Sequence, residues 1–596
     1  MDAVRIRYIK DKLAQLPTGN ITYKTINNKK YPYYQWTENG KQKGRRVKDE
    51  ELERLSEEIA ERKELQQLLR EAQNAGEAAV LNDEYFFSVL KRGQELESFV
   101  APVASYKKRE CFSKLQDYIY GNSTDRVMIL YGLRRTGKTT LIRQLIGEMN
   151  EAMRQKTAYI QINSSMDLAK INLDLKQLAK QGYKYIFIDE VTLMEDFIEG
   201  AALFSDIYAS SGMKIVLSGT DSLGFIFSED RELYDRCYMI HTTFVPYREF
   251  ANVLGINSID EYIRYGGTMS LGGIDYNHTG MTFATTASTN EYVDSAIARN
   301  IQHSLKNYQQ GDHFRHLEEL YEANELTSAI NRIVEDINHR FTIEVLTKDF
   351  KSNDLSLSAK NLLRDRDNPN DVLYRIDRSA VNEKLRQLLE IKNKPEQKVA
   401  INDAHKHEIK EYLDFLDLTV DVDIVYLPDF EHSTKHTVVT QPGMRYAQAE
   451  ALVKTLMQDR VFGMLSLVER NAVTKRIMSD IQGRMLEDIV LLETKLAYPK
   501  RDVFKLIFAT GEFDMVIADP EAACCQIFEI KHSSETVPSQ YRHLLDTAKC
   551  QATEFRFGTI KGKYVLYRGQ SRETQGINYI NVEEYLLSLG KKDLSS

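Results

Sequence analysis

The feature that most constrains the fold of this sequence is a glycine-rich loop between a strand-like run and a helix-like run. The loop is Gly132-Leu133-Arg134-Arg135-Thr136-Gly137-Lys138-Thr139, which has the form GxxxxGKT. The short apolar run Val127–Tyr131 precedes it, and apolar residues at helical spacing follow it over 140–146. In this context the pattern predicts a phosphate-binding loop, because glycines let backbone N–H groups close around phosphate oxygens at a helix N-terminus.

Two residues at the end of this loop have specific expected roles. Lys138 is expected to reach the β- and γ-phosphate oxygens, and the Thr139 hydroxyl is expected to hold Mg²⁺. The sequence therefore predicts ATP and Mg²⁺ as ligands, whereas a Gly-Lys turn opening an ordinary helix would predict neither. The other residues expected to line the nucleotide are Gly132, Arg134, Arg135, Thr136, Gly137 and Thr140.

A second apolar run, Tyr185–Ile188, ends in two acidic residues. Asp189 fits the role of holding the Mg²⁺ shell, and Glu190 can polarise the water that attacks the γ-phosphate. Buried strands also end in solvated Asp-Glu pairs. The acidic pair lies about fifty residues after the glycine loop, and this position favours a hydrolytic site over a solvated pair.

A third apolar run, Lys214–Leu217, leads into Ser218-Gly219-Thr220-Asp221. P-loop ATPases with an additional strand keep a polar sensor of the γ-phosphate at this point, and Thr220 is the candidate here. Hydroxyl groups at loop ends also commonly cap the backbone. Arg236 could act as an arginine finger on a neighbouring subunit, or it could be an ordinary surface arginine.

Length and composition indicate a multidomain globular protein. A chain of 596 residues suggests about three to five domains, and its 42 % hydrophobic and 28 % charged residues are typical of soluble proteins. No apolar run approaches the ~20 residues of a membrane span, and the N-terminus lacks the apolar core of a signal peptide. The cysteines have neither zinc-site nor disulfide-framework spacing, so we expect a cytoplasmic protein without a membrane partner. They are Cys111, Cys237, Cys524, Cys525 and Cys550.

Residues 1–48 are strongly basic, with twelve Lys or Arg against three acidic residues. Within them 20–26, 31–36 and 41–47 have the composition of short strands joined by hairpin turns. This basic sheet with aromatics resembles the small three-stranded DNA-contacting modules of integrases and transposases. Its lysines would then contact phosphates, or they would form a solvated face over a small aromatic core.

Residues 49–103 are expected to form an amphipathic helix and a linker. Leucines and isoleucines repeat on one face from Lys48 to about Gln73, with Arg62 interrupting it. Such a helix could pair subunits in a homo-oligomer, or hold the basic sheet away from the rest of the chain.

Residues 104–255 alternate strand-like and helix-like segments, which predicts an α/β domain with a parallel sheet covered by helices on both faces. The nucleotide is expected at the carboxyl edge of that sheet, where the three motifs fall.

Two elements after these motifs carry a family resemblance: Pro246-Tyr247-Arg248-Glu249-Phe250, and Tyr265-Gly266-Gly267. With them, the chain from about residue 105 onward resembles archaeal and bacterial P-loop ATPases of AAA type. The middle of the chain, 256–470, is expected to be mostly helical from its residue pattern. The resemblance implies a winged helix near 341–363 within it, and a nuclease-like domain at the end of the chain. One departure lies in the segment 191–195. In the family an aromatic residue often follows the acidic pair closely, and this segment contains none.

The last predicted domain, 471–596, carries a second constellation of charged residues. A helix over 476–496 contains Glu487, a strand over 511–517 contains Asp514, and a strand over 526–531 contains Glu529 and Lys531. This order resembles the core of the PD-(D/E)XK nucleases, a restriction-endonuclease-like α/β fold.

The spacing of these residues suits a metal-dependent site. Glu529 and Lys531 share one strand face, and Asp514 could share a Mg²⁺ with Glu529 while Lys531 activates water or stabilises charge. Gln540, expected to open the next helix, would then orient the nucleophile. Coincidental ion pairs, or a nuclease fold kept only for binding, would give the same pattern.

The sequence thus favours an ATP-hydrolysing protein that acts on nucleic acid, expected to be DNA, through a Mg²⁺-dependent nuclease-like domain. By analogy alone, this architecture implies mobile-element or phage-defence biology. The alternative is a nucleotide-dependent switch or scaffold whose C-terminal domain only binds.

Overall fold

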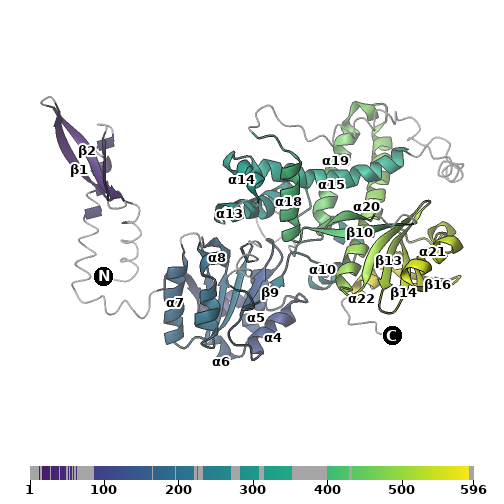
Figure 1. The fold of residues 1–596 in the computed structure, drawn as a ribbon, viewed down its shortest axis with the longest axis horizontal. Coiled ribbons are helices and arrows are strands. Elements are labelled where there is room, and N and C mark those ends of the chain that lie inside the picture. Colours follow the sequence, from purple (N-terminus) through teal and green to yellow (C-terminus); the bar gives the residue numbers. More distant parts are fainter. Residues whose placement is uncertain are drawn as a thin grey trace. The chain divides into compact units, whose positions relative to one another are not determined.

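The computed structural model describes 13, 16–26, 29–38, 41–47, 51–52, 54–56, 58–59, 62–63, 86–163, 166–194, 196–220, 224–225, 233–269, 282–307, 314–351, 399–427 and 433–589. The chain divides into two compact units (Figure 1). The first comprises 1–88 with 173–181, and the second comprises 89–172 with 182–596. Among the described residues, no helix has the length and apolar character that crossing a membrane requires.

The first unit contains a three-stranded antiparallel sheet in the order β1-β2-β3. Its strands are β1 (Asn20–Ile26), β2 (Lys29–Glu38) and β3 (Lys41–Arg46). Trp36 stacks on Tyr34 with ring centroids 5.2 Å apart, and Val47 packs with Leu55 and Ile59 in a small core. The basic residues 43, 45 and 46 on β3 are exposed. Most of the helix expected over 48–73 lies outside the described residues, and the described positions among 51–63 are helical.

The second unit begins with a six-stranded sheet in the order β4-β6-β7-β8-β5-β9. The strand before the glycine loop, β5, lies between β8 and β9, so β8 is the additional strand that separates it from β7. All pairs are parallel except that of β4 with β6. The bounds are β4 (Val89–Lys91), β5 (Val127–Tyr131), β6 (Thr157–Gln161), β7 (Tyr185–Asp189), β8 (Lys214–Gly219) and β9 (Cys237–His241).

One face of this sheet is covered by three helices whose apolar side chains form a core with residues of β5 to β9. They are α3 (Gly93–Val100), α4 (Phe112–Tyr120) and α5 (Lys138–Glu148). The other short elements of this region are η2 (Ala101–Val103), α6 (Glu151–Arg154), η3 (Val191–Leu193), α8 (Phe197–Gly200) and the π-helix η4 (Phe204–Ala209). The helix α7 (Leu168–Lys180) begins in the second unit, and its residues from 173 onward belong to the first.

A helical region follows, as predicted for much of the middle of the chain. It contains α10 (Tyr247–Leu254), α11 (Ile259–Tyr265), α12 (Thr286–Tyr292), the π-helix η5 (Val293–Ala298), α13 (Arg299–Asn307), α14 (Arg315–Glu322), α15 (Leu326–Lys351), α18 (Asp403–Phe415), α19 (Pro442–Gln458) and η9 (Arg460–Phe462). Residues 341–351, where a winged helix was expected to begin, continue α15 as one helix. The rest of that expected element lies outside the described residues.

The unit ends in an eight-stranded sheet in the order β11-β10-β12-β13-β14-β15-β17-β16. β12, β13 and β14 are antiparallel neighbours, and β15 pairs parallel with β14 after the helix α21. β10 and β11 arise from the stretch expected to be helical, so the sequence prediction missed them. The bounds are β10 (Thr419–Leu427), β11 (Thr434–Val439), α20 (Leu467–Ala497), β12 (Asp502–Phe508), β13 (Glu512–Asp519), β14 (Cys524–Ile530), η10 (Pro538–Gln540), α21 (Thr547–Phe557), β15 (Thr559–Tyr567), β16 (Arg572–Thr574), β17 (Ile577–Asn581) and α22 (Val582–Ser588).

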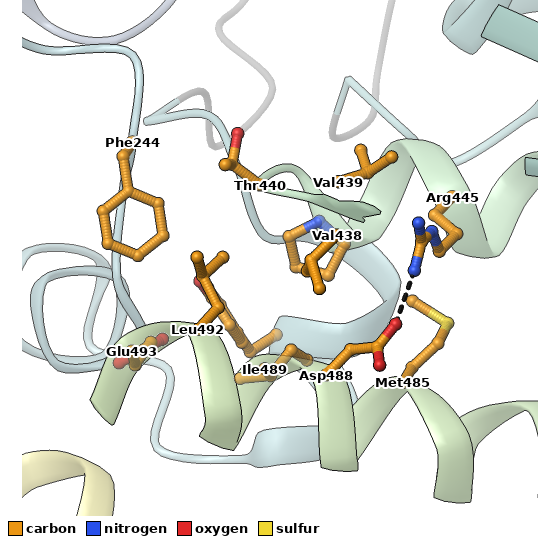
Figure 2. A pocket seen from close by; sticks show the side chains of 12 residues that line it. Phe244, Val438, Val439, Thr440, Arg445, Met485, Asp488, Ile489, Leu492 and Glu493 are labelled. Atoms are coloured by element: carbon orange, nitrogen blue, oxygen red, sulfur yellow. Dashed lines mark hydrogen bonds and ion pairs between the residues drawn. The ribbon is translucent and has the colours of Figure 1, made fainter. Parts of the chain in front are cut away.

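The segment after β9 meets the long helix α20 of the eight-stranded sheet region. Figure 2 shows Phe244 opposite Leu492 and Glu493 of α20, around a pocket that also contains the Arg445–Asp488 ion pair. The N–H of Tyr247, at the start of α10, donates to Glu493 Oε1 at 2.7 Å. A buried carboxyl group therefore joins the two parts of the unit.

This carboxyl group makes the stability of the unit depend on pH. Burial raises the pKa of Glu493 to about 7 from 4.5. The folded chain then binds this proton more tightly than the unfolded chain, so its stability falls as the pH rises from about 4.5 to 7. Glu493→Gln keeps an acceptor for Tyr247 but cannot ionise. Between pH 5 and pH 8 its melting temperature should therefore fall by roughly 5 °C less than that of the unmodified chain.

Scanning calorimetry at the two pH values measures this difference, with exposed Glu521→Gln as the control. Parallel pH profiles for the unmodified chain and Glu493→Gln would contradict the assignment.

Candidate functional site

The glycine loop has a backbone that depends on its two glycines. Gly132 has φ +140°, and a Cβ there would lie 2.6 Å from Thr242 Oγ1. Gly137 has φ +91° and immediately precedes α5, which begins at Lys138. Both glycines therefore hold conformations that other residues rarely adopt. Arg135, between them, also has a positive φ of 65°.

Lys138 is buried within the loop. Its ammonium group donates to the carbonyl oxygens of Gly132 and Leu133, each at 2.8 Å. Burial lowers the pKa of Lys138 to about 8, although the nearby carboxylates of Glu190 and Asp189 act in the opposite direction. The ammonium group thus lies inside the loop, where the charge of a bound phosphate would favour its protonated form.

Asp189, at the end of β7, accepts hydrogen bonds from three hydroxyl groups. The Thr139 and Ser218 hydroxyls donate at 2.7 Å each, and the Tyr159 hydroxyl donates at 2.9 Å. The structure thus brings Thr139 and Asp189 together as a Mg²⁺ site would need. The sequence prediction did not include Tyr159 and Ser218. The signal available for them was a polar residue within a buried apolar strand or at its end.

Glu190 follows Asp189 in a left-handed conformation, with φ 58°. Such a conformation is costly for a residue other than glycine and often occurs at functional sites. Burial raises the pKa of Glu190, and the Lys138 charge opposes that rise. The Thr220 hydroxyl donates to Glu190 Oε2 at 3.3 Å, and Asn300 of α13 donates to the Thr220 carbonyl at 2.6 Å. The structure therefore places the sensor candidate directly against the candidate base.

The remaining predicted residues of the loop differ in their surroundings. Arg134 and Arg135 are exposed, and Thr140 is half-buried on α5. The buried Thr136 hydroxyl donates to the Leu133 carbonyl at 2.8 Å, so it contributes to the shape of the loop.

Arg236 lies at the opposite edge of the six-stranded sheet. It precedes β9, which runs parallel to β5, and its carbonyl accepts from the first residue of β5. Its guanidinium group pairs with Asp206 at 3.2 Å, and both side chains are exposed. Arg236 therefore lies away from the loop of its own chain, and a role at a nucleotide would have to be in trans.

The second predicted constellation meets around Lys531, directly after β14. Its ammonium group contacts Asp514 Oδ2 and Glu529 Oε2, each at 2.7 Å. Asp514 lies at an irregularity in the β12–β13 pairing, opposite Lys505, and also accepts from the Ile530 N–H at 2.8 Å. β-Bulges of this kind redirect side chains and are common beside active sites.

The two carboxyl groups on Lys531 differ in protonation. Burial alone would raise the pKa of Asp514, but the Lys531 and Lys505 ammonium groups outweigh it and hold that pKa below its usual range. Burial and the Asp514 charge raise the pKa of Glu529 well above its usual range. Its Oε1 is buried without a hydrogen-bond partner. These opposite shifts favour the ionised form of Asp514 over that of Glu529.

A third contributor, Glu487 of α20, lies close to Asp514. Glu487, Glu512 and Asp514 offer carboxylate oxygens within 4.8 Å of one another, which suits a hard cation such as Mg²⁺. Glu529, expected as a metal ligand, is not in this group. Sequence reasoning missed Glu512, although it lies two residues before Asp514 on the same strand.

Three cations neutralise this group of carboxylates. Besides Lys531, Arg484 contacts Glu487 at 2.5 Å, and Lys505 contacts Glu487 at 3.3 Å and Glu512 at 2.8 Å. Lys505 is buried on β12, with 5 % of its side chain exposed. A lysine in an otherwise apolar strand was the available signal for it.

Gln540 differs from its prediction. It ends the short helix η10, and α21 begins only at Thr547, so Gln540 does not open that helix. Its side chain donates to the Glu535 carbonyl at 2.8 Å and accepts from the Val537 N–H at 3.2 Å. These bonds hold the Gln540 amide within its own turn.

Comparison with known structures gives weak overall similarities. The structure of the Aeropyrum pernix ORC1 protein in complex with DNA is 13 % identical, with a TM-score of 0.19, over 62 % of this chain and 98 % of that chain. The S. cerevisiae Hsp104–ADP complex is 12 % identical, with a TM-score of 0.19, over 70 % of this chain and 61 % of that chain. Scores this low do not bear on the fold. No curated protein matches the chain.

Two family models match parts of the sequence. Residues 3–57 match a domain of unknown function, and residues 124–251 match a model described as an AAA domain. The second match covers the glycine loop, the strand that ends at Asp189, and Thr220. The family match and the loop geometry together support a P-loop ATPase of AAA type in this part of the chain.

Proposed function

We propose that this chain is a Mg²⁺-dependent ATPase that acts on nucleic acid. The observation that carries the ATPase part of this proposal is the meeting of four residues at the carboxyl edge of the six-stranded sheet. Thr139 contacts Asp189, and Thr220 contacts Glu190. Metal ligands, a base and a sensor are thus supplied next to the phosphate-binding loop.

Each residue has a defined task in this reaction. The loop N–H groups and Lys138 bind the phosphates, and Thr139 and Asp189 would hold Mg²⁺, which supplies charge neutralisation when bound. Glu190 takes the proton of the attacking water, a task helped by the raised pKa that burial gives it. Thr220 holds the Glu190 carboxylate by a hydrogen bond.

The test is phosphate release from ATP by the full chain. Release should require Mg²⁺ and stop when EDTA is added, because Thr139 and Asp189 would hold the Mg²⁺ that neutralises the phosphate charge. Phosphate release that never exceeds the protein-free blank would contradict the proposal.

For the C-terminal region we propose a phosphodiester-cleaving site of PD-(D/E)XK type. The succession of α20, antiparallel β12–β14, α21 and parallel β15 supports it. Lys531 touches both Asp514 and Glu529, so its charge can stabilise a phosphate transition state beside a metal held by Asp514, Glu487 and Glu512.

A second candidate is a nucleotide-dependent switch whose C-terminal region only binds. The ion pairs favour it, because Arg484, Lys505 and Lys531 already compensate most of the carboxylate charge. A metal would have to compete with these cations. The measurement that separates the two candidates is DNA cleavage.

The basic three-stranded sheet is proposed to contact nucleic acid. Deleting residues 1–48 should then weaken DNA binding and flatten its salt dependence, because fewer phosphate contacts release fewer counterions. Filter binding at salt concentrations from about 50 to 200 mM measures both quantities, and ATP hydrolysis without DNA should survive the deletion. An equal affinity and an equal salt slope would show that the sheet is only a solvated surface.

A further inference from the structure

Arg109, between η2 and α4, is a buried arginine that touches the glycine loop. Its side chain is 7 % exposed, and four hydrogen bonds and an ion pair hold its guanidinium group. Nε and one terminal nitrogen contact Glu249 Oε2 at 2.7 and 2.6 Å. The remaining donors bind the carbonyls of Thr136, Thr242 and Phe244 at 2.9, 2.8 and 2.8 Å.

The Thr136 carbonyl belongs to the peptide bond that leads into Gly137. In a planar trans peptide the carbonyl and the following N–H point in opposite directions. Because the carbonyl points at Arg109, the Gly137 N–H points away from Arg109. Gly137 has the left-handed φ of 91° and few steric restraints of its own, so an external anchor is needed to fix this peptide plane.

The same guanidinium group also holds the segment 242–244, which contacts the glycine loop. The Thr243 hydroxyl accepts from the Leu133 N–H at 3.1 Å, and the Thr242 hydroxyl lies 2.9 Å from that of Thr136. Arg109 therefore joins the glycine loop and the segment 242–244 by hydrogen bonds to carbonyl groups in both.

We propose that Arg109, held by Glu249, is a positioning residue for ATP binding: it sets the 136–137 peptide so that the Gly137 N–H donates to the β-phosphate. This inference rests on the proposed nucleotide site. It also gives a task to Glu249, the acid of the Pro246–Phe250 element, which forms a buried ion pair with Arg109 from the first turn of α10.

The test must separate positioning from simple stabilisation. Arg109→Met leaves Glu249 buried without its partner and should destabilise the chain, whereas Arg109→Met with Glu249→Leu removes both charges and should regain much of the melting temperature. Arg109→Lys keeps the charge next to Glu249 but lacks the planar fork that reaches several carbonyls. Arg248→Met is the matched control, because Arg248 pairs with Glu110 at 2.8 Å and not with the loop.

Affinity for a fluorescent ATP analogue is measured for each variant below its melting temperature. The double variant and Arg109→Lys should bind about 10- to 100-fold more weakly than the unmodified chain, although both remain folded. Arg248→Met should bind normally.

Two results would overturn the inference: affinity in the double variant that recovers together with its melting temperature, or unchanged affinity in Arg109→Lys. If the unmodified chain itself binds no ATP, the proposed function fails instead.

Discussion

Replacing Glu190 with glutamine is expected to abolish ATP hydrolysis while ATP still binds. The carboxamide keeps the size of the side chain and can still accept the Thr220 hydrogen bond, but it cannot take up the proton of the attacking water. A general base contributes about 10²- to 10⁴-fold, so phosphate release should fall by that factor. The dissociation constant for an ATP analogue should change little, because Glu190 does not belong to the phosphate-binding loop.

Lys138→Ala serves as the contrasting variant. It removes the buried ammonium group that lies within the loop, so both ATP binding and hydrolysis should be lost. Phosphate release by Glu190→Gln at the unmodified rate would show that Glu190 is not the base.

At the second site, Asp514→Asn and Lys531→Ala are both expected to abolish DNA cleavage, but for different reasons. The carboxamide of Asp514→Asn lacks the negative charge that the metal requires, so Mg²⁺ should no longer raise the melting temperature. Lys531→Ala removes a cation that competes for Asp514, so Mg²⁺ should still stabilise the chain. Cleavage is nevertheless expected to be lost, because the Lys531 charge no longer stabilises the transition state.

Melting temperatures over a Mg²⁺ titration, together with plasmid conversion, distinguish the two variants. Lys495→Ala is a suitable control, because this lysine lies on α20 but pairs with Asp423 at 3.2 Å instead of with the candidate site. Unreduced cleavage by Lys531→Ala would remove that residue from the mechanism, and unchanged Mg²⁺ stabilisation in Asp514→Asn would remove Asp514 from the metal site.

The strands around the glycine loop could be predicted because their signals are local. β5 to β8 are apolar apart from polar residues near their ends, and each is buried at almost every position. A glycine loop marks the end of the first of them, and an acidic pair marks the end of the third. β9 has one buried residue and is otherwise half-buried or exposed, and β4 has only three residues. β10 likewise has mostly half-buried residues. Such strands are stabilised by their neighbours in the sheet, and their own sequence is a weak guide.

Residues of the candidate sites could be predicted from the sequence where a single short motif contained them. Lys138, Asp189 and Glu190 come from two short motifs, and period-two spacing places Glu529 and Lys531 together. Arg109 and Glu249 are 140 residues apart, and no local pattern joins them. Long-range partners of this kind supply the contacts that orient a motif, and only the folded chain brings them together.

The central claim is that one chain combines ATP hydrolysis with an action on nucleic acid. The most direct measurement is conversion of supercoiled plasmid by the full chain, with Mg²⁺ and with or without ATP. The account predicts nicked or linear plasmid in the reaction that contains both Mg²⁺ and ATP, and none with Asp514→Asn. Plasmid that stays supercoiled in every reaction, with Mg²⁺ or Mn²⁺ and with or without ATP, would contradict it.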